Sequence, residues 1–178
     1  MFNRHQLKDG RQLIIRDALP PDAKALIVHA NAVISETNFT TRAPGEFEIT
    51  VEQERQNLKT YFDTDNKLFI LAELDGQVVG LLNFAGGLRT RLRHQGEFGI
   101  SVRQHSCGLG IGTLLLEALI DWAKSGGIIT KINLRVRTDN PAAIKIYLRA
   151  GFVIEGTIAN EMLIDGIYYH FHWMGLKL

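Results

Sequence analysis

The segment Ser106-Cys107-Gly108-Leu109-Gly110-Ile111-Gly112-Thr113-Leu114-Leu115 decides the fold of this chain. It follows the strand-like run 98–102 and opens an amphipathic helix. Glycines at alternate positions leave backbone N–H groups unshielded, and the N-terminus of the helix adds a partial positive charge. This combination predicts a socket for an anionic phosphate group. The alternative is a tight turn that needs glycine and binds nothing.

Two common phosphate-binding loops do not fit this segment. A Walker loop is excluded because no Lys-Ser or Lys-Thr pair follows the glycines. The dinucleotide pattern G-x-G-x-x-G, begun at Gly108, requires a third glycine where the chain has Thr113. A nucleotide-binding protein of another kind stays open as an alternative.

The composition is typical of a globular protein. With 178 residues, 46% of them hydrophobic and 22% charged, the chain is long enough for one domain with a real core, which we expect over residues 1–178. The net charge of +1 gives no general attraction to nucleic acid or to an anionic membrane, so neither is an expected partner.

Targeting and redox features favour the cytoplasm. No apolar run reaches the roughly 18 residues of a membrane span, and residues 1–6 lack the apolar core of a signal peptide. The single cysteine, Cys107, excludes an internal disulfide and a cysteine-built zinc site. A reducing, cytoplasmic location is the default expectation.

Hydrophobic periodicity predicts a mixed α/β sheet. The expected strands are 11–16, 68–74, 78–84, 97–102, 132–136, 152–163 and 168–176, and the expected helices are 20–35, 50–62, 110–124 and 140–151. Thr50 with Gln53 forms a capping box, and Asn140-Pro141 is a cap followed by a first-turn proline. The expected core contacts of the first helix are Ala25, Ile27, Val28 and Ala32.

The glycine segment and a second run together resemble the GNAT superfamily of N-acetyltransferases. The second run is Asn140-Pro141-Ala142-Ala143-Ile144-Lys145-Ile146-Tyr147-Leu148-Arg149-Ala150-Gly151-Phe152. The resemblance covers nearly the whole chain and implies a mostly antiparallel central sheet of about seven strands flanked by about four helices. The ending Asp165-Gly166-Ile167-Tyr168-Tyr169 is similar to the subgroup related to ribosomal-protein N-terminal acetyltransferases.

The resemblance implies acetyl-coenzyme A as the cosubstrate, from which an acetyl group moves to a primary amine by direct attack in a ternary complex. The family binds pyrophosphate through the N–H groups of the loop, which here are those of Gly108, Leu109, Gly110, Ile111, Gly112 and Thr113. The pantetheine arm would pair with the preceding strand at Ile100 and Val102. Asn140 would lie near that arm, unless it is only a helix cap. Cys107 stands where the family usually has Gln or Arg.

The resemblance also implies the residues that move protons. Tyr147 matches the general acid for the leaving thiolate, because a phenol with a pKa of about 10 suits a thiolate of similar basicity. The alternative for Tyr147 is core packing beside Ile144 and Leu148. Glu97 matches the general base, and Glu36 is the second candidate; either carboxylate is otherwise a surface residue.

Three further features have less specific interpretations. Cys107 precedes a helix N-terminus, which favours a nucleophile, but direct transfer needs no covalent enzyme intermediate. His170 and His172 can point to one face of a strand, but a third metal ligand is not evident, so no metal is expected. The cluster of Arg89, Arg91 and Arg93 is interpreted as a solvated hairpin tip. Alternatively, it guides an acidic acceptor or the 3′-phosphate of the cofactor.

The expected acceptor is a small-molecule amine or a protein N-terminus. Residues 36–47 and 165–172 would line its pocket, and their aromatic, weakly charged composition favours an acceptor with apolar character. A second copy of the chain is a further expected partner, because dimers are common in such families. The alternative to an enzyme is a non-catalytic module that binds acyl-CoA as a sensor or regulator, which the departure at Cys107 motivates.

Overall fold

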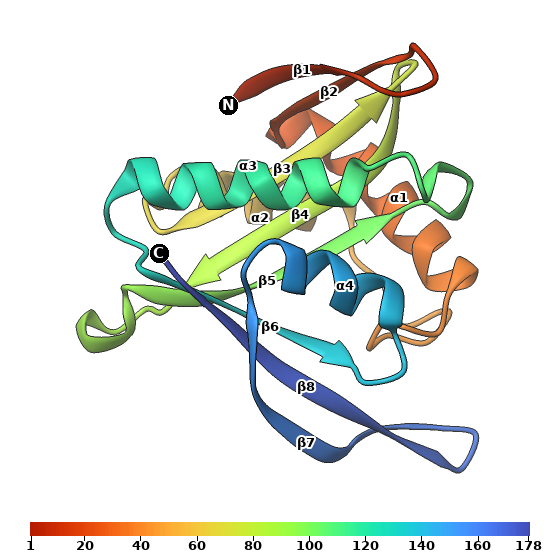
Figure 1. Cartoon of the computed structure of the whole chain (residues 1–178). Helices are drawn as coiled ribbons and strands as arrows, with labels where there is room; N and C mark the ends of the chain where they lie inside the picture. Colours follow the sequence, from red (N-terminus) through yellow and green to blue (C-terminus); the bar gives the residue numbers. More distant parts are fainter.

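The computed structural model describes residues 1–178, and its eight strands form one sheet in the order β1-β2-β3-β4-β5-β6-β8-β7 (Figure 1). The strands are β1 (Phe2–Gln6), β2 (Gln12–Asp17), β3 (Lys67–Leu74), β4 (Gln77–Gly86), β5 (Gln95–Val102), β6 (Lys131–Arg137), β7 (Val153–Ile164) and β8 (Ile167–Lys177). Neighbouring strands are antiparallel, except that β5 and β6 are parallel. The expected mixed, mostly antiparallel sheet is confirmed.

Four α-helices cover the sheet. They are α1 (Ala23–Glu36), α2 (Val51–Phe62), α3 (Ile111–Gly126) and α4 (Pro141–Arg149). Figure 1 shows α3 and α4 in front of the sheet and α1 and α2 behind it. The larger core cluster lies under α3 and α4, and a smaller one joins α1 and α2 to the other face. None of the helices combines the length and the apolar character that crossing a membrane requires.

The structure corrects the expected strand number, since it has eight strands and not about seven. The additional strand is β1, which pairs with β2 from Phe2–Arg16 to Gln6–Gln12. Its residues are mostly exposed and show no alternation of apolar and polar side chains. Main-chain pairing at the edge of the sheet holds β1, so hydrophobic periodicity carried no signal for it.

The expected core face of α1 was wrong. Val28 is 59% exposed, and Ala25 is exposed as well. The buried side of the helix consists of Ala23, Leu26, His29, Val33 and Ile34. A polar residue, His29, lies at the centre of this buried side, and periodicity of apolar residues therefore selected a neighbouring stripe.

The strands β5 and β6 pair over only three positions, Gln95–Lys131, Gly96–Ile132 and Glu97–Asn133. Beyond Glu97 they diverge, and α4 crosses the region between them (Figure 1). The main-chain groups of β5 on that side consequently have no partner strand. This split in the sheet positions the site described next.

Candidate active site

The glycine segment makes the turn from β5 into α3. Gly108 and Gly110 have φ values of 82° and 86°, in the left-handed region that favours glycine. Gly112 lies in the first turn of α3, where an added Cβ would come no closer than 4.0 Å to the side chains of Ile146 and Val102. Two of the three glycines are therefore required by the backbone, and the third is not.

The N–H groups of residues 108–113 make no hydrogen bond within the protein. Helical bonding begins only at Leu114, whose N–H donates to the Gly110 carbonyl at 3.1 Å. Six donors are thus available around the positive end of the α3 dipole. Such an arrangement favours an anion like a phosphate group.

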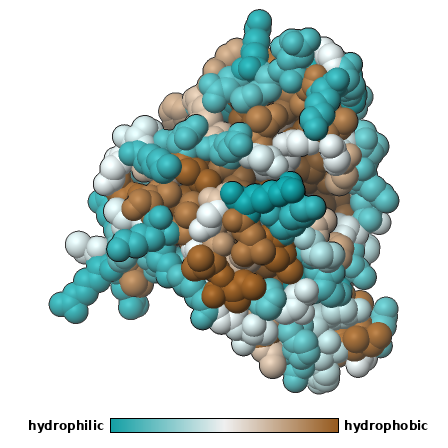
Figure 2. Space-filling model, in the orientation of Figure 1, coloured by the Kyte–Doolittle hydropathy of each residue, from teal (hydrophilic) through white to brown (hydrophobic).

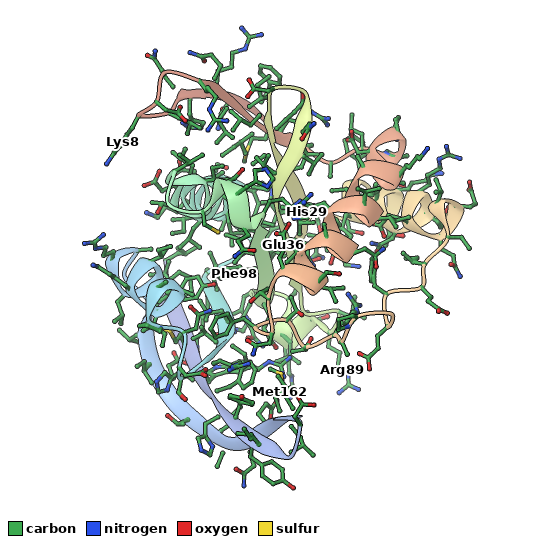
Figure 3. All side chains as sticks on the ribbon, turned by 90° about the vertical axis from the view of Figure 1, so that its right-hand side faces the viewer. Lys8, His29, Glu36, Arg89, Phe98 and Met162 are labelled. Atoms are coloured by element: carbon green, nitrogen blue, oxygen red, sulfur yellow. The ribbon has the colours of Figure 1, made fainter.

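Glu36 fastens the end of α1 to this turn. Its Oε1 accepts a hydrogen bond from Arg103 Nε and its Oε2 accepts one from the Gln104 N–H, both at 2.8 Å. The hydrogen bond from Gln104 lowers the pKa of Glu36 below its ordinary value, and Arg103 acts in the same direction. Figure 3 shows Glu36 between α1 and the sheet. Both of its oxygens are occupied.

The Cys107 thiol lies 3.5 Å from the Arg103 carbonyl oxygen. Partial burial raises the pKa of Cys107, and the charge of Glu36 raises it further. The group is therefore a protonated thiol at neutral pH, which makes it a poor nucleophile.

Tyr147 projects from α4 against two aromatic rings. It is 8% exposed and packs edge-on to Phe98 at 5.8 Å between ring centroids, with Phe152 at 6.0 Å. Its hydroxyl makes no hydrogen bond to the protein and is not fully enclosed. Burial raises the pKa of Tyr147 to about 12. Leu148, expected on the same face, is 49% exposed on another side of α4.

Glu97 lies on the opposite face of β5. Consecutive residues of a strand point to opposite faces, so Glu97 faces the side of α1 and α2 while Phe98 faces Tyr147. Glu97 Oε2 accepts a hydrogen bond from Arg135 Nε at 3.1 Å, and Arg135 also binds Glu161 at 3.1 Å. Glu97 and Tyr147 therefore lie on opposite sides of β5, at the point where β6 diverges from it.

The remaining expected cofactor residues lie on the α3 and α4 side. Ile100 and Val102 are partly buried against the core in the unpaired part of β5. Asn140 caps α4, and its Oδ1 accepts a hydrogen bond from the Ala143 N–H at 3.1 Å. Its Nδ2 makes no hydrogen bond in the protein, so the side chain keeps one free donor group.

The histidine pair and the arginine cluster lie elsewhere. His170 Nδ1 accepts a hydrogen bond from the Asn160 N–H at 3.0 Å, and His172 Nδ1 lies 2.9 Å from Thr157 Oγ1. No group of three or more His, Cys, Asp or Glu side chains is arranged to hold a metal ion. The loop between β4 and β5, at the end of β5 away from the glycine turn, holds Arg89, Arg91 and Arg93.

Two residues of this region were missed by the sequence analysis. His29 is 1% exposed; its Nε2 lies 3.0 Å from Ser101 Oγ and its Nδ1 lies 3.3 Å from the Val78 carbonyl oxygen. Arg137 is 3% exposed, whereas Arg135, two residues before it on the same side of β6, is exposed. Neither residue belongs to a recognisable sequence motif, and only its long-range contacts give it a role.

Comparison with known proteins identifies relatives. Residues 34–152 match the model of the family described as "Acetyltransferase (GNAT) family". A solved acetyltransferase of that family from Streptococcus pneumoniae is 35% identical with a TM-score of 0.91, covering 93% of this chain and 99% of that one. A ribosomal-protein-alanine N-acetyltransferase from Brucella melitensis is 26% identical with a TM-score of 0.81, covering 92% and 99%.

A curated relative is the L-amino acid N-acetyltransferase of Escherichia coli. It is 34% identical over 105 residues, which are 59% of this chain and 65% of the relative. The match therefore spans less than two thirds of that relative's length.

Proposed function

The chain belongs to the GNAT family of acetyltransferases, and we propose that it transfers the acetyl group of acetyl-coenzyme A to a primary amine. One observation carries the proposal: six free N–H groups at the start of α3 adjoin the stretch of β5 that β6 leaves unpaired. The first feature suits a diphosphate, and the second suits an extended amide-bearing arm. Coenzyme A has both parts in that order.

The cosubstrate would bind mainly through the main chain. Its diphosphate accepts hydrogen bonds from residues 108–113, and each charge-assisted bond contributes roughly 1.5–3 kcal/mol before ordering costs. The pantetheine amides pair with β5 at Ile100 and Val102, as an added strand pairs with a sheet edge. The free Nδ2 of Asn140 donates to the arm while Oδ1 continues to cap α4.

The chemistry uses the two faces of β5. An amine enters from the Glu97 face, gives a proton to Glu97 through water, and attacks the thioester carbon. The C–N bond forms and unpaired N–H groups of β5 stabilise the oxyanion. The C–S bond then breaks as Tyr147 protonates the leaving thiolate, and the second proton released by the nitrogen returns to the tyrosinate through water. A phenol whose pKa is raised to about 12 remains protonated at neutral pH. The proposal leaves Cys107 without a covalent role.

We assign the base to Glu97 and not to Glu36. Both oxygens of Glu36 already hold the glycine turn, whereas Glu97 has one oxygen without a partner. A carboxylate is a weak base, so it suits an amine that is easily deprotonated. An α-amino group, with a pKa near 8, is such an amine, and a lysine side chain is not.

The acceptor is therefore the α-amino group of an amino acid or of a protein N-terminus. The names of two relatives support this class, since one is an L-amino acid N-acetyltransferase and the other a ribosomal-protein-alanine N-acetyltransferase. Neither relative is described as a non-catalytic sensor.

Residues 1–178 act as one acetyltransferase domain, because all eight strands share one sheet. We propose that it acts in the cytoplasm, where acetyl-coenzyme A is available to it.

A second copy of the chain is the proposed protein partner, and exposed apolar side chains near the end of the β7–β8 hairpin support this (Figure 2). Sedimentation should give a dimer that Leu163→Lys weakens; a monomer at all concentrations would contradict it.

The function is tested by release of free thiol from acetyl-coenzyme A. Free L-amino acids, peptides with N-terminal alanine and polyamines are offered side by side, and binding of coenzyme A is measured by calorimetry. We expect heat of binding together with thiol release for α-amines. Binding without release from any amine would favour the sensor, and no binding would remove the proposal altogether.

A further inference from the structure

Arg137, the last residue of β6, is a charged side chain that is 3% exposed. Its Nε and Nη2 donate to the two carboxylate oxygens of Asp139, at 2.9 and 2.7 Å. Its Nη1 donates to the backbone carbonyl of Asn38 at 2.8 Å. The ion pair compensates the buried charge, and it raises the pKa of Arg137 further.

Two aromatic rings enclose the same guanidinium group. The ring centroid of Tyr169 lies 3.7 Å from the guanidinium carbon, and that of Phe39 lies 4.7 Å from it. The planar cation thus joins three segments that are distant in the sequence: the connection between α1 and α2, the turn before α4, and β8. Lysine could not replace it, since an ammonium group has neither the fork nor the plane.

The connection between α1 and α2, residues 37–49, depends on this contact. Its other hydrogen bonds are internal or run to the flanking helices, as between Ala43 and Glu46 and between Thr40 and Arg42. The bond from Arg137 to Asn38 is the one hydrogen bond that ties this connection to the sheet. Phe39, 41% exposed, adds the aromatic contact.

The contact lies on the acceptor side of the sheet. Asn133 pairs with Glu97, and side chains alternate along a strand, so Arg135 and Arg137 share the face of Glu97. Arg135 binds Glu97 directly, and Arg137 follows it at about 7 Å along the strand.

We propose that Arg137 is a positioning residue that holds residues 37–49 against β8 and so forms one wall of the acceptor site. The inference rests on the proposed acetyltransferase function and deepens it. Because Arg137 lies on the face opposite Tyr147, it sets the affinity for the amine and leaves that for acetyl-coenzyme A unchanged.

Two variants test the assignment. Phe39→Ala removes one aromatic ring without unpairing a buried charge. Arg137→Lys keeps the positive charge but loses the paired hydrogen bonds that the guanidinium group donates to Asp139. Their matched controls are Phe62→Ala, an exposed phenylalanine at the end of α2, and Arg16→Lys, an arginine that joins Asp22 and Glu73 far from the site. The measurements are kcat, the KM of each substrate, and amide hydrogen exchange over residues 37–49.

Both test variants should raise the KM of the amine about tenfold, with the KM of acetyl-coenzyme A changed less than about twofold. Amide exchange over residues 37–49 should become faster in both, and in neither control. Equal rises in the two KM values, or test variants that behave like their controls, would overturn the assignment. If no amine is acetylated, the proposed function fails, and hydrogen exchange alone then decides whether Arg137 holds the connection.

Discussion

Glu97 and Phe98 are neighbours in the sequence but face opposite sides of the sheet, and this separates the two proposed proton-transfer groups. Glu97 faces the acceptor side, and Phe98 packs against Tyr147 on the cofactor side. The reacting atoms would meet between them, in the split beside β5. A shift of one position along β5 thus separates the side on which the amine loses a proton from the side on which the thiolate gains one.

Tyr147→Phe should lower kcat about a hundredfold, as loss of a general acid does. The change removes a hydroxyl that makes no hydrogen bond in the protein and keeps both aromatic contacts, so the free energy of unfolding should change by less than about 0.5 kcal/mol. Steady-state kinetics and urea unfolding check the two parts. Unchanged kcat at pH 7 would remove the assigned role.

Glu97→Gln should lower kcat/KM about a hundredfold at pH 7 and much less above pH 9, where an α-amine loses its proton without help. The matched control is Glu161→Gln, which removes the other carboxylate bound to Arg135 and leaves Glu97 in place. The pH dependence of kcat/KM checks this. A loss of the same size at every pH, or in both variants, would argue against a base at Glu97.

At the scale of elements, the turn from β5 into α3 uses its three glycines differently. Positive φ angles require glycine at Gly108 and Gly110, while Gly112 is helical with room for a methyl group. The sequence shows three equivalent glycines, and only the backbone conformation separates them. The first residues of α2 and α4, in contrast, were predictable, because the side chains that cap these N-termini act locally.

Gly112→Ala should change the dissociation constant for coenzyme A by less than about threefold. It should raise the free energy of unfolding by up to about 1 kcal/mol, because alanine favours a helix. Gly110→Ala should cost about 1–2 kcal/mol, because its φ of 86° is unfavourable for a side chain. Calorimetry with coenzyme A and urea unfolding provide both quantities. Equal effects of the two substitutions on the free energy of unfolding would contradict the conclusion that the backbone requires glycine at Gly110 but not at Gly112.

At the scale of the whole molecule, His29 joins α1 to two strands of the sheet. It is held neutral between Val78 on β4 and Ser101 on β5, and burial lowers its pKa to about 4. The unfolded chain takes up a proton on this residue near pH 6.5, whereas the folded chain does not until about pH 4. Below pH 6.5 the proton therefore favours the unfolded state.

The free energy of unfolding should consequently fall by up to about 3 kcal/mol through His29 as the pH drops from 6.5 to 4. Above pH 6.5 this contribution is fully present. His29→Gln should flatten that part of the pH dependence, and the exposed His105→Gln should not. Urea unfolding between pH 4 and pH 8 measures the slopes, and equal slopes in His29→Gln and the original protein would refute the lowered pKa.

By itself, the sequence determined the family, the order of the main elements, and the turn that opens α3, because glycines, caps and periodic apolar residues act over a few positions. Tertiary structure alone decided the pairing of β1, the buried face of α1, the hydrogen bonds that occupy Glu36, and the burial of His29 and Arg137. For Glu36, His29 and Arg137 a deciding partner lies far away along the chain, whereas β1 pairs with the adjacent β2 through main-chain bonds that leave no side-chain pattern. Local patterns cannot encode such contacts, since they exist only after the sheet has assembled.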